Sequence, residues 1–259
     1  PLNNDYFLVH SPISSKANQS DFDQFKGQEY APDRMLEKAI QFLDTTASDK
    51  PYFLYYPSPI PHVSLQVPDS LVDQYRDVFE EEPYLGNKGY TAHQFPNAAY
   101  AAMITHLDSE VGKIWDSVKE KGQEENTLIL FSSDNGPTFA GGVDPDFFNS
   151  AAGLRGLKMD VYEGGIRIPF IAYWKGKIKA GSISDLISGH WDMFNTFAEL
   201  AGQDQSAPDG ISILPELLGE SQNETHDYIY FEYPEKRGQI ALRIEDWKGV
   251  KVEMKTNLD

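Results

Sequence analysis

Hydrophobic residues recur at helical spacing in three segments of the chain. Between residues 33 and 43 the apolar positions lie three or four residues apart, and Asp33 stands where a capping residue would begin a helix. The same spacing runs over residues 96–122 and again over residues 192–201, each closed by a glycine. The pattern therefore predicts three helices. In the longest, the stripe expected to face the core is Tyr100, Ile104, Leu107, Val111, Ile114, Trp115 and Val118, with His106 on the opposite side.

Three other apolar runs are shorter and show no alternation of polar and apolar residues. They cover residues 52–56, 127–131 and 168–174 and are rich in aromatic and β-branched side chains. Runs of this kind are typical of strands that are covered on both faces. Because helix-bearing segments separate them, we expect an α/β fold with a helix-covered, mostly parallel or mixed sheet.

The last fifty residues follow a different pattern. Residues 228–233 and 240–244 are strand-like, and the turn between them predicts an antiparallel hairpin. We therefore expect two domains: an α/β domain over residues 1–207 and the start of a small antiparallel sheet module over residues 208–259.

The composition excludes several classes of partner and site. Aspartate and glutamate number 40 against 22 lysines and arginines, which gives a net charge of -18. Such a chain is not a general binder of nucleic acids or anionic membranes, so an anionic ligand needs a local cationic pocket. No run approaches the roughly 18 apolar residues that span a bilayer. Cysteine is absent, which excludes disulfide bonds, zinc-thiolate sites and a cysteine nucleophile in this chain.

Asp134 and Asn135 come directly after the second apolar run, where open α/β sheets place their ligand sites. A carboxylate next to an amide carbonyl offers two hard oxygen donors, the ligand type of Ca²⁺ or Mg²⁺. Gly136 permits the sharp turn that would aim both at one ion. The same three residues would also form an ordinary Asx turn without a ligand. The spacing alone leaves both interpretations open.

A glycine-broken loop over residues 154–169 gathers three cations, Arg155, Lys158 and Arg167, in an otherwise acidic chain. Lys158 is a compact charge suited to an oxygen of a sulfate or phosphate group, whereas Arg167 could pair with Glu163 and brace the loop. A solvated surface turn would have the same composition.

Two histidines are further candidates. His62 stands in a proline-flanked segment just after the first apolar run. Its imidazole could bind an anion or give a proton to a departing oxygen near neutral pH. His93 lies in a loop that could line the mouth of a pocket, which makes it a substrate-binding candidate. A single histidine is more often structural, so neither residue identifies a site by itself.

Together these blocks resemble the formylglycine-dependent sulfatases of the arylsulfatase type, in the alkaline-phosphatase-like superfamily. The resemblance runs from about Asp33 to the end of the chain. Its most specific part is the Tyr-Glu-Gly-Gly-x-Arg-x-Pro block at residues 162–169, which a lysine precedes. Ser-Asp-Asn-Gly at residues 133–136 and Pro-His at residues 61–62 agree with it in order and spacing.

The resemblance implies hydrolysis of a sulfate monoester of an aryl or carbohydrate substrate. A formylglycine hydrate would attack sulfur, and Ca²⁺, with Mg²⁺ the less expected metal, would hold the sulfate oxygens. By position, Asp134 and Asn135 would be two of the calcium ligands. Lys158 would contact the sulfate and the bridging oxygen, and His62 would contact the sulfate or assist the leaving group. The family also implies a periplasmic, secreted or lysosomal location.

One part of the family pattern is missing. Formylglycine is made from Cys or Ser in a Cys/Ser-x-Pro-x-Arg motif, and the nearest match, at residues 30–34, has tyrosine at the decisive position. The family's further calcium carboxylates and its lysine-histidine pair are also absent from the chain. We therefore expect the chain to be the C-terminal portion of a longer sulfatase, with an incomplete sheet, and to be inactive alone.

Two other functions stay open. A metal-dependent phosphatase or phosphodiesterase of the same superfamily would need a second metal site rich in histidine and aspartate. Asn135, where a histidine would serve, and a total of 6 histidines count against it. A non-catalytic relative that binds sulfated glycans would lack the Cys/Ser-x-Pro-x-Arg motif in its upstream sequence as well.

Overall fold

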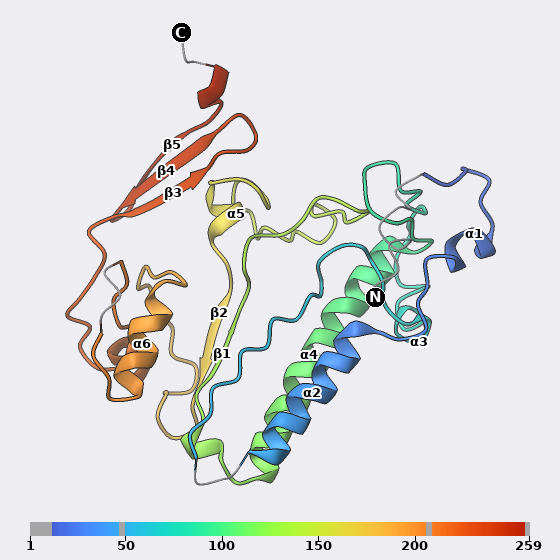
Figure 1. The fold of residues 1–259 in the computed structure, drawn as a ribbon. Coiled ribbons are helices and arrows are strands. Elements are labelled where there is room, and N and C mark those ends of the chain that lie inside the picture. The colour runs from blue at the N-terminus through green and yellow to red at the C-terminus, as the bar shows by residue number, and fades with distance from the viewer. Residues whose placement is uncertain (1–11, 47–49, 206–208, 257–259) are drawn as a thin grey trace, which may run out of the picture. The chain divides into compact units, whose positions relative to one another are not determined.

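The computed structural model describes residues 12–46, 50–205 and 209–256. The chain divides into two compact units: a first unit of residues 1–123 and 137–153, and a second unit of residues 124–136 and 154–259. The first unit contains α1 (Gln19–Asp23), α2 (Ala31–Thr45), α3 (Asp69–Val72) and α4 (Pro96–Glu120) (Figure 1). The second contains β1 (Ile129–Ser132), α5 (Glu163–Ile166), β2 (Phe170–Tyr173), α6 (Asp192–Leu200), α7 (Leu214–Leu218), β3 (Ile229–Tyr233), β4 (Gln239–Ile244) and β5 (Trp247–Lys251), with 3-10 turns at Glu124–Asn126 and Met254–Thr256.

All three predicted helices are confirmed, as α2, α4 and α6. The start of α2 differs from the prediction, because its N-cap residue is Tyr30 and Asp33 lies inside the first turn. Pro32 at the beginning of α2 explains the earlier start, since the fixed φ of proline suits the first helical positions and its missing N–H is not needed there.

Helices α2 and α4 lie side by side in the first unit (Figure 1). α2 buries Leu36, Ala39 and Leu43, which is the face that the sequence predicts. α4 buries Tyr100 and Val118 of the predicted stripe, but its buried side also includes His106, which is only 8% exposed, and leaves out Ile104, which is 44% exposed. The prediction that His106 lies opposite the buried side of α4 is therefore wrong.

Polar partners explain why α4 buries the side that carries His106 and Glu110. His106 Nε2 lies 3.0 Å from Asp33 Oδ1 on α2. Glu110 is fully buried, and its Oε2 accepts a 3.0 Å hydrogen bond from the hydroxyl of Ser58. A carboxylate buried in this way needs such donors. Burial, and then the nearby Glu110 carboxylate, raises the pKa of the Tyr30 hydroxyl.

The first turn of α4 is capped from outside the helix. The carboxylate of Glu81 accepts hydrogen bonds from the backbone N–H groups of Asn97 and Ala98, the second at 3.2 Å. These groups have no partner within a helix, and a negative charge near them is favourable to the helix dipole. Burial raises the pKa of Glu81 even though both hydrogen bonds act in the opposite direction.

Replacing this cap should lower the stability of the first unit. We expect Glu81→Ala to reduce the free energy of unfolding by about 1 kcal/mol, because two backbone donors lose their acceptor. Glu82→Ala is the matched control, since Glu82 is exposed and its carboxylate makes no hydrogen bond or ion pair in the described part of the chain. Urea unfolding followed by circular dichroism measures the difference. Equal unfolding midpoints for the two variants would show that Glu81 is not a cap.

The first predicted strand differs from the structure. Residues 52–56 are extended but join no strand of the described chain. Phe53 and Tyr55 are 67% and 75% exposed, whereas the alternate residues Tyr52, Leu54 and Tyr56 are half-buried. The prediction that both faces of this segment are covered is therefore wrong. An unbroken apolar run lacks the alternation that would mark one face as exposed.

The other two predicted strands are present, as β1 and β2. They pair antiparallel, with Ile129 opposite Tyr173 and Ser132 opposite Phe170. The described strands therefore form no parallel ladder, in contrast to the mostly parallel sheet that the sequence suggests. Apolar runs indicate where strands lie, but their direction depends on the path of the connection, which composition does not encode.

The predicted C-terminal hairpin is confirmed. β3 and β4 pair antiparallel, with Tyr233 opposite Gln239 across the predicted turn. β5 extends this sheet beyond the two predicted strands, and its Trp247 is 83% exposed. The domain boundary expected at residue 207 stays a prediction.

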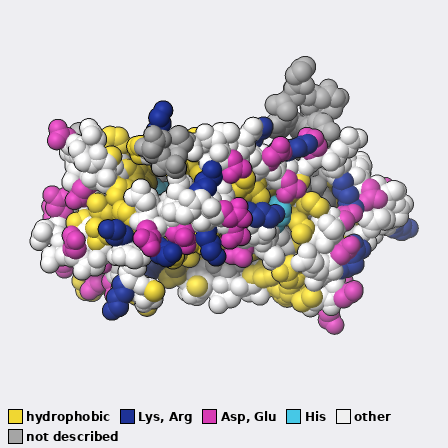
Figure 2. Space-filling view, turned by 90° about the horizontal axis from the view of Figure 1, so that it is seen from below, with side chains coloured by type: hydrophobic (Ala, Val, Ile, Leu, Met, Phe, Trp, Pro, Cys, Tyr) yellow, Lys and Arg dark blue, Asp and Glu magenta, His cyan; other side chains and the backbone are white. Residues whose placement is uncertain are grey.

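The surface carries both signs of charge. On the face drawn in Figure 2, acidic and basic side chains are interspersed and hydrophobic side chains emerge in several patches. Among the described helices, none has the length and apolar character needed to cross a membrane.

Candidate active site

The Asp134 turn begins where β1 ends, at Ser132. Asp134 is exposed, and its carboxylate makes no hydrogen bond or ion pair with any residue that the structure describes. The side-chain amide N–H of Asn135 donates to the carbonyl of Gly136 at 2.8 Å, which leaves the Asn135 amide oxygen available to a ligand. The turn therefore offers a carboxylate and an amide oxygen, as the sequence predicts.

Close backbone packing fixes this turn to α5. The N–H of Gly136 donates to the carbonyl of Gly165 at 2.8 Å. A Cβ added to Gly136 would lie 1.9 Å from the carbonyl oxygen of Gly164, which no side chain can tolerate. Glycine is needed here for the approach of two backbones rather than for an unusual φ angle.

The same packing continues into the lysine loop, residues 154–162. The N–H of Gly164 donates to the carbonyl of Arg155 at 2.8 Å. Cβ atoms on Gly164 and Gly165 would lie 2.0 Å from Gly156 O and 2.1 Å from Asp160 O, respectively. The Asp134 turn and the lysine loop, which are some twenty residues apart in the sequence, are thus held on one backbone scaffold at α5.

Lys158 is the cation of this loop that is left for a ligand. It is half-buried, and its ammonium has no hydrogen bond or ion pair among the described residues. The guanidinium of Arg155 instead lies over the ring of Tyr162, 3.9 Å from its centroid. Met159, next to Lys158, has a positive φ of 74°, a conformation that the surrounding hydrogen bonds must maintain.

Glu163 does not bind the cation that the sequence suggests. Its carboxylate lies 2.6 Å from Lys248 Nζ and 3.3 Å from an Nη of Arg243, whereas Arg167 is exposed. The prediction of a Glu163 pair with Arg167 is therefore wrong. The partners lie about eighty residues later on β4 and β5, so local spacing could not identify them.

The C-terminal sheet also holds the lysine loop directly. The buried side-chain amide of Gln239 donates to the carbonyl of Met159 at 3.0 Å and accepts from the N–H of Val161 at 3.5 Å. Lys236 Nζ lies 2.9 Å from Asp160 Oδ1. These contacts were not predictable from the sequence, because Gln239 carries no motif.

The close backbone packing at Gly136, Gly164 and Gly165 can be tested by its effect on stability. Gly164→Ala should destabilise the second unit by about 1–3 kcal/mol, because the new Cβ collides with backbone rather than with a mobile side chain. Gly249→Ala on the exposed β5 is the matched control, since an added Cβ there meets no atom within 4 Å. Thermal unfolding of both variants measures the difference. A Gly164→Ala variant as stable as the control would contradict the close packing.

His62 belongs to the first unit and sits on an anchored backbone. Val63 and Leu65 are buried at 7% and 0% exposure in one cluster with Met103. The His62 ring itself is exposed, and its Nδ1 contacts the carbonyl of Val63. A carbonyl only accepts hydrogen bonds, so Nδ1 carries a hydrogen and Nε2 is the nitrogen that can meet a ligand.

His93, also in the first unit, has the opposite arrangement. Its Nδ1 accepts the backbone N–H of Phe95 at 3.0 Å. Burial lowers the pKa of His93 to about 4, so the ring is neutral at physiological pH and its hydrogen is on Nε2. His93 therefore cannot exchange protons near pH 7, but it is a fixed hydrogen-bond donor.

This pKa predicts how acid affects stability. Between the folded pKa of about 4 and the ordinary value of about 6.5, the unfolded chain binds more protons, so stability falls as the pH drops through this range. We expect the wild type to lose about 2 kcal/mol more than His93→Gln between pH 7 and pH 5. Urea unfolding at both pH values measures this difference. Identical losses would mean that His93 is not buried as a neutral ring.

The structure brings Asp134, Asn135 and Lys158 together within the second unit, while His62 and His93 belong to the first unit. In the described residues there is no group of three or more His, Cys, Asp or Glu that could hold a metal ion. Asp134 and Asn135 supply oxygens of the kind that calcium prefers, but calcium takes about six to eight of them. The donors thus fit the metal in kind, but they are fewer than the metal needs.

A sequence-family model described as Sulfatase matches residues 2–203. Arylsulfatase G of Mus musculus and the uncharacterized sulfatase YdeN of Escherichia coli are each 32% identical over 235 residues, 86% of this chain and 38% of theirs. The N-acetylgalactosamine-6-sulfatase of Homo sapiens is 27% identical over 210 residues, 80% of this chain and 34% of that protein. The chain therefore spans less than two-fifths of the length of these curated relatives.

Solved structures of other proteins share the fold of this chain. The structure of Ps i-CgsB in complex with k-i-k-neocarrahexaose aligns with a TM-score of 0.71 at 27% identity, over 87% of this chain and 47% of that one. The phosphonate monoester hydrolase of Agrobacterium radiobacter aligns with a TM-score of 0.63 at 17% identity, which shows a shared fold alone.

The structural match gives the fold class first: the chain has the alkaline-phosphatase-like α/β fold. The family follows from the sequence match, which covers most of the chain. The chain belongs to the sulfatase family, as its motif order predicts.

Proposed function

We propose that the complete protein hydrolyses sulfate monoesters of carbohydrates. The observation that carries this proposal is the half-buried ammonium of Lys158, which has no partner in the described chain and stands on a loop locked to the Asp134 turn. In a chain with a net charge of -18, such a cation is suited to the oxygens of an anionic ester.

Hydrolysis breaks the bond between sulfur and the leaving oxygen, which gains negative charge until it takes up a proton. Lys158 would stabilise charge on the sulfuryl and bridging oxygens. His62, protonated at Nε2, would donate a hydrogen bond or the proton to the leaving oxygen, since Val63 holds its other nitrogen. His93, as a neutral donor, would bind substrate and take no part in proton transfer.

Asp134 and Asn135 would hold Ca²⁺ in preference to Mg²⁺, with the remaining donors supplied from outside the described residues. When bound, the ion would add positive charge at the sulfate oxygens. The nucleophile would be a formylglycine in a longer protein, because the chain holds no Cys/Ser-x-Pro-x-Arg motif. We therefore expect the 259-residue chain to have no turnover by itself.

Named relatives support a glycan sulfate as the substrate. One relative is an N-acetylgalactosamine-6-sulfatase, and one solved relative was crystallised with a neocarrahexaose. For the complete protein we propose a sulfated glycan substrate and a periplasmic, secreted or lysosomal location.

Assays of the complete protein with a sulfated oligosaccharide test this function, with matching phosphate and phosphonate esters in parallel. We expect turnover of the sulfate ester. Lys158→Ala should lower kcat/KM by about 100-fold or more, because a charge at the reacting group is lost. Lys177→Ala is the matched control, since Lys177 is exposed and its ammonium has no partner in the described chain.

Other outcomes would overturn the proposal. Faster hydrolysis of the phosphate or phosphonate ester would favour the alternative of a metal-dependent phosphatase or phosphodiesterase. Binding of the sulfated oligosaccharide without turnover would favour a non-catalytic glycan-binding relative.

A further inference from the structure

Lys158 stands at a corner of a four-residue turn that runs from Leu157 to Asp160. The N–H of Asp160 donates to the carbonyl of Leu157 at 2.9 Å and closes the turn. Met159 is the third residue of the turn, and its φ of 74° is the positive value that a type II turn requires there. Glycine is usual at that position, because a side chain makes a positive φ costly. The turn therefore needs contacts from elsewhere to keep its shape.

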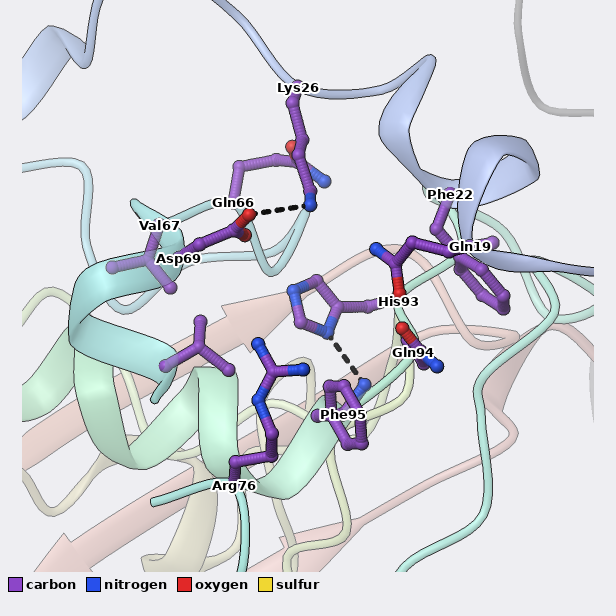
Figure 3. Close-up of a pocket in the computed structure, with 12 residues that line it drawn as sticks. Gln19, Phe22, Lys26, Gln66, Val67, Asp69, Arg76, His93, Gln94 and Phe95 are labelled. Atoms are coloured by element: carbon purple, nitrogen blue, oxygen red, sulfur yellow. Dashed lines mark hydrogen bonds and ion pairs between the residues drawn. The ribbon is translucent and has the colours of Figure 1, made fainter. Parts of the chain in front are cut away.

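No side-chain partner sets the direction of Lys158. Lys26 in the first unit shows the contrasting case, since its ammonium lies 2.6 Å from Asp23 and 2.8 Å from Asp69, the second contact being drawn in Figure 3. Lys158 makes no such ion pair or hydrogen bond with the residues that the structure describes. The backbone of the turn is therefore what sets the direction in which the Lys158 side chain leaves the loop.

Gln239 on β4 holds the backbone that follows Lys158. Its side-chain N–H donates to the carbonyl of Met159 at 3.0 Å, and its side-chain oxygen accepts the N–H of Val161 at 3.5 Å. Gln239 and Val161 are each only 3% exposed, so water has little access to these hydrogen bonds. The bond to Met159 fixes the orientation of the peptide group that follows the residue with positive φ.

Asp160 braces the other end of the turn. Its Oδ2 accepts the N–H of Leu157 at 3.0 Å, and its Oδ1 lies 2.9 Å from Nζ of Lys236, in the connection between β3 and β4. Lys236 is exposed, so water screens this ion pair and it contributes less than the buried amide of Gln239. One hairpin thus holds both ends of the turn that carries Lys158.

We infer that Gln239 is a positioning residue for Lys158. By holding the turn at Met159, it aims the ammonium of Lys158 at the anionic group of the substrate, and it touches no substrate itself. The inference rests on the proposed function, because it needs Lys158 at the reacting group. A charge that is displaced from the reacting group stabilises the transition state less, so loss of Gln239 should lower the rate while Lys158 is still present.

A double-mutant cycle on the complete protein tests this role, with kcat/KM for a sulfate ester as the readout. Gln239→Met keeps the length of the side chain but cannot donate a hydrogen bond. We expect it to lower kcat/KM about tenfold or more in the wild-type background. In a Lys158→Ala background the same change should cost less than about twofold, because the group that Gln239 positions is gone.

Gln222→Met is the matched control. Gln222 is a half-buried glutamine of the same unit, and its amide donates to the carbonyls of Ser212 and Glu224 at 3.0 Å and 2.8 Å, away from the lysine loop. It should leave kcat/KM within about twofold of the wild type. Amide hydrogen exchange over residues 157–161, followed by mass spectrometry, should accelerate in Gln239→Met and not in Gln222→Met.

Circular dichroism checks that each variant is folded. If Gln239→Met is not, Gln239→Asn decides, since its amide is one carbon too short to reach both backbone groups. An equal loss with and without Lys158 would overturn the inference, because it would show a general structural role. Wild-type kcat/KM or unchanged exchange in the Gln239 variant would also overturn it, and the proposed function would stand. No turnover of any sulfate ester by the wild type would refute the proposed function, and the inference would fall with it.

Discussion

Contact between three stretches of backbone is the constraint on which the site of the second unit depends. Gly136, Gly164 and Gly165 each place a Cα where an added Cβ would lie about 2 Å from a carbonyl oxygen. Hydrogen bonds between these stretches would be lost if a side chain pushed them apart. The backbone at Asp134 and Lys158 is therefore positioned by main-chain geometry, and neither side chain is needed to hold the loops.

The two histidines show how one hydrogen bond sets the chemistry of a side chain. In His62 a carbonyl contacts Nδ1, and in His93 a backbone N–H does so. A carbonyl stabilises a ring that carries a hydrogen at Nδ1 and is compatible with protonation of the other nitrogen. A backbone N–H at Nδ1 is not compatible with protonation of the ring, because the N–H donor would then face a second donor. Two histidines in loops of one unit are thereby left with different hydrogen-bonding capacities.

Much of the fold could be predicted because its signals are local. The three longer helices follow from periodicity, and the Asp134 turn and Lys158 follow from motifs in order along the chain. The burial of His106 and Glu110 on α4 could not be predicted, since their polar partners Asp33 and Ser58 come from other parts of the chain. The direction of the strands could not be predicted for a related reason: apolar content indicates that β1 and β2 are strands but contains no information about which way they pair.

The ion pairs of Glu163 have a consequence for the order of assembly. Arg243 and Lys248 follow Glu163 by 80 and 85 residues, and Gln239 follows Met159 by 80. A ribosome adds about 5–20 residues per second, so a newly made lysine loop waits roughly 4–16 s for these partners. During that interval the loop lacks the side chains that hold it from the C-terminal sheet. Its anchoring is therefore completed only after the strands that carry Arg243 and Lys248 have been synthesised.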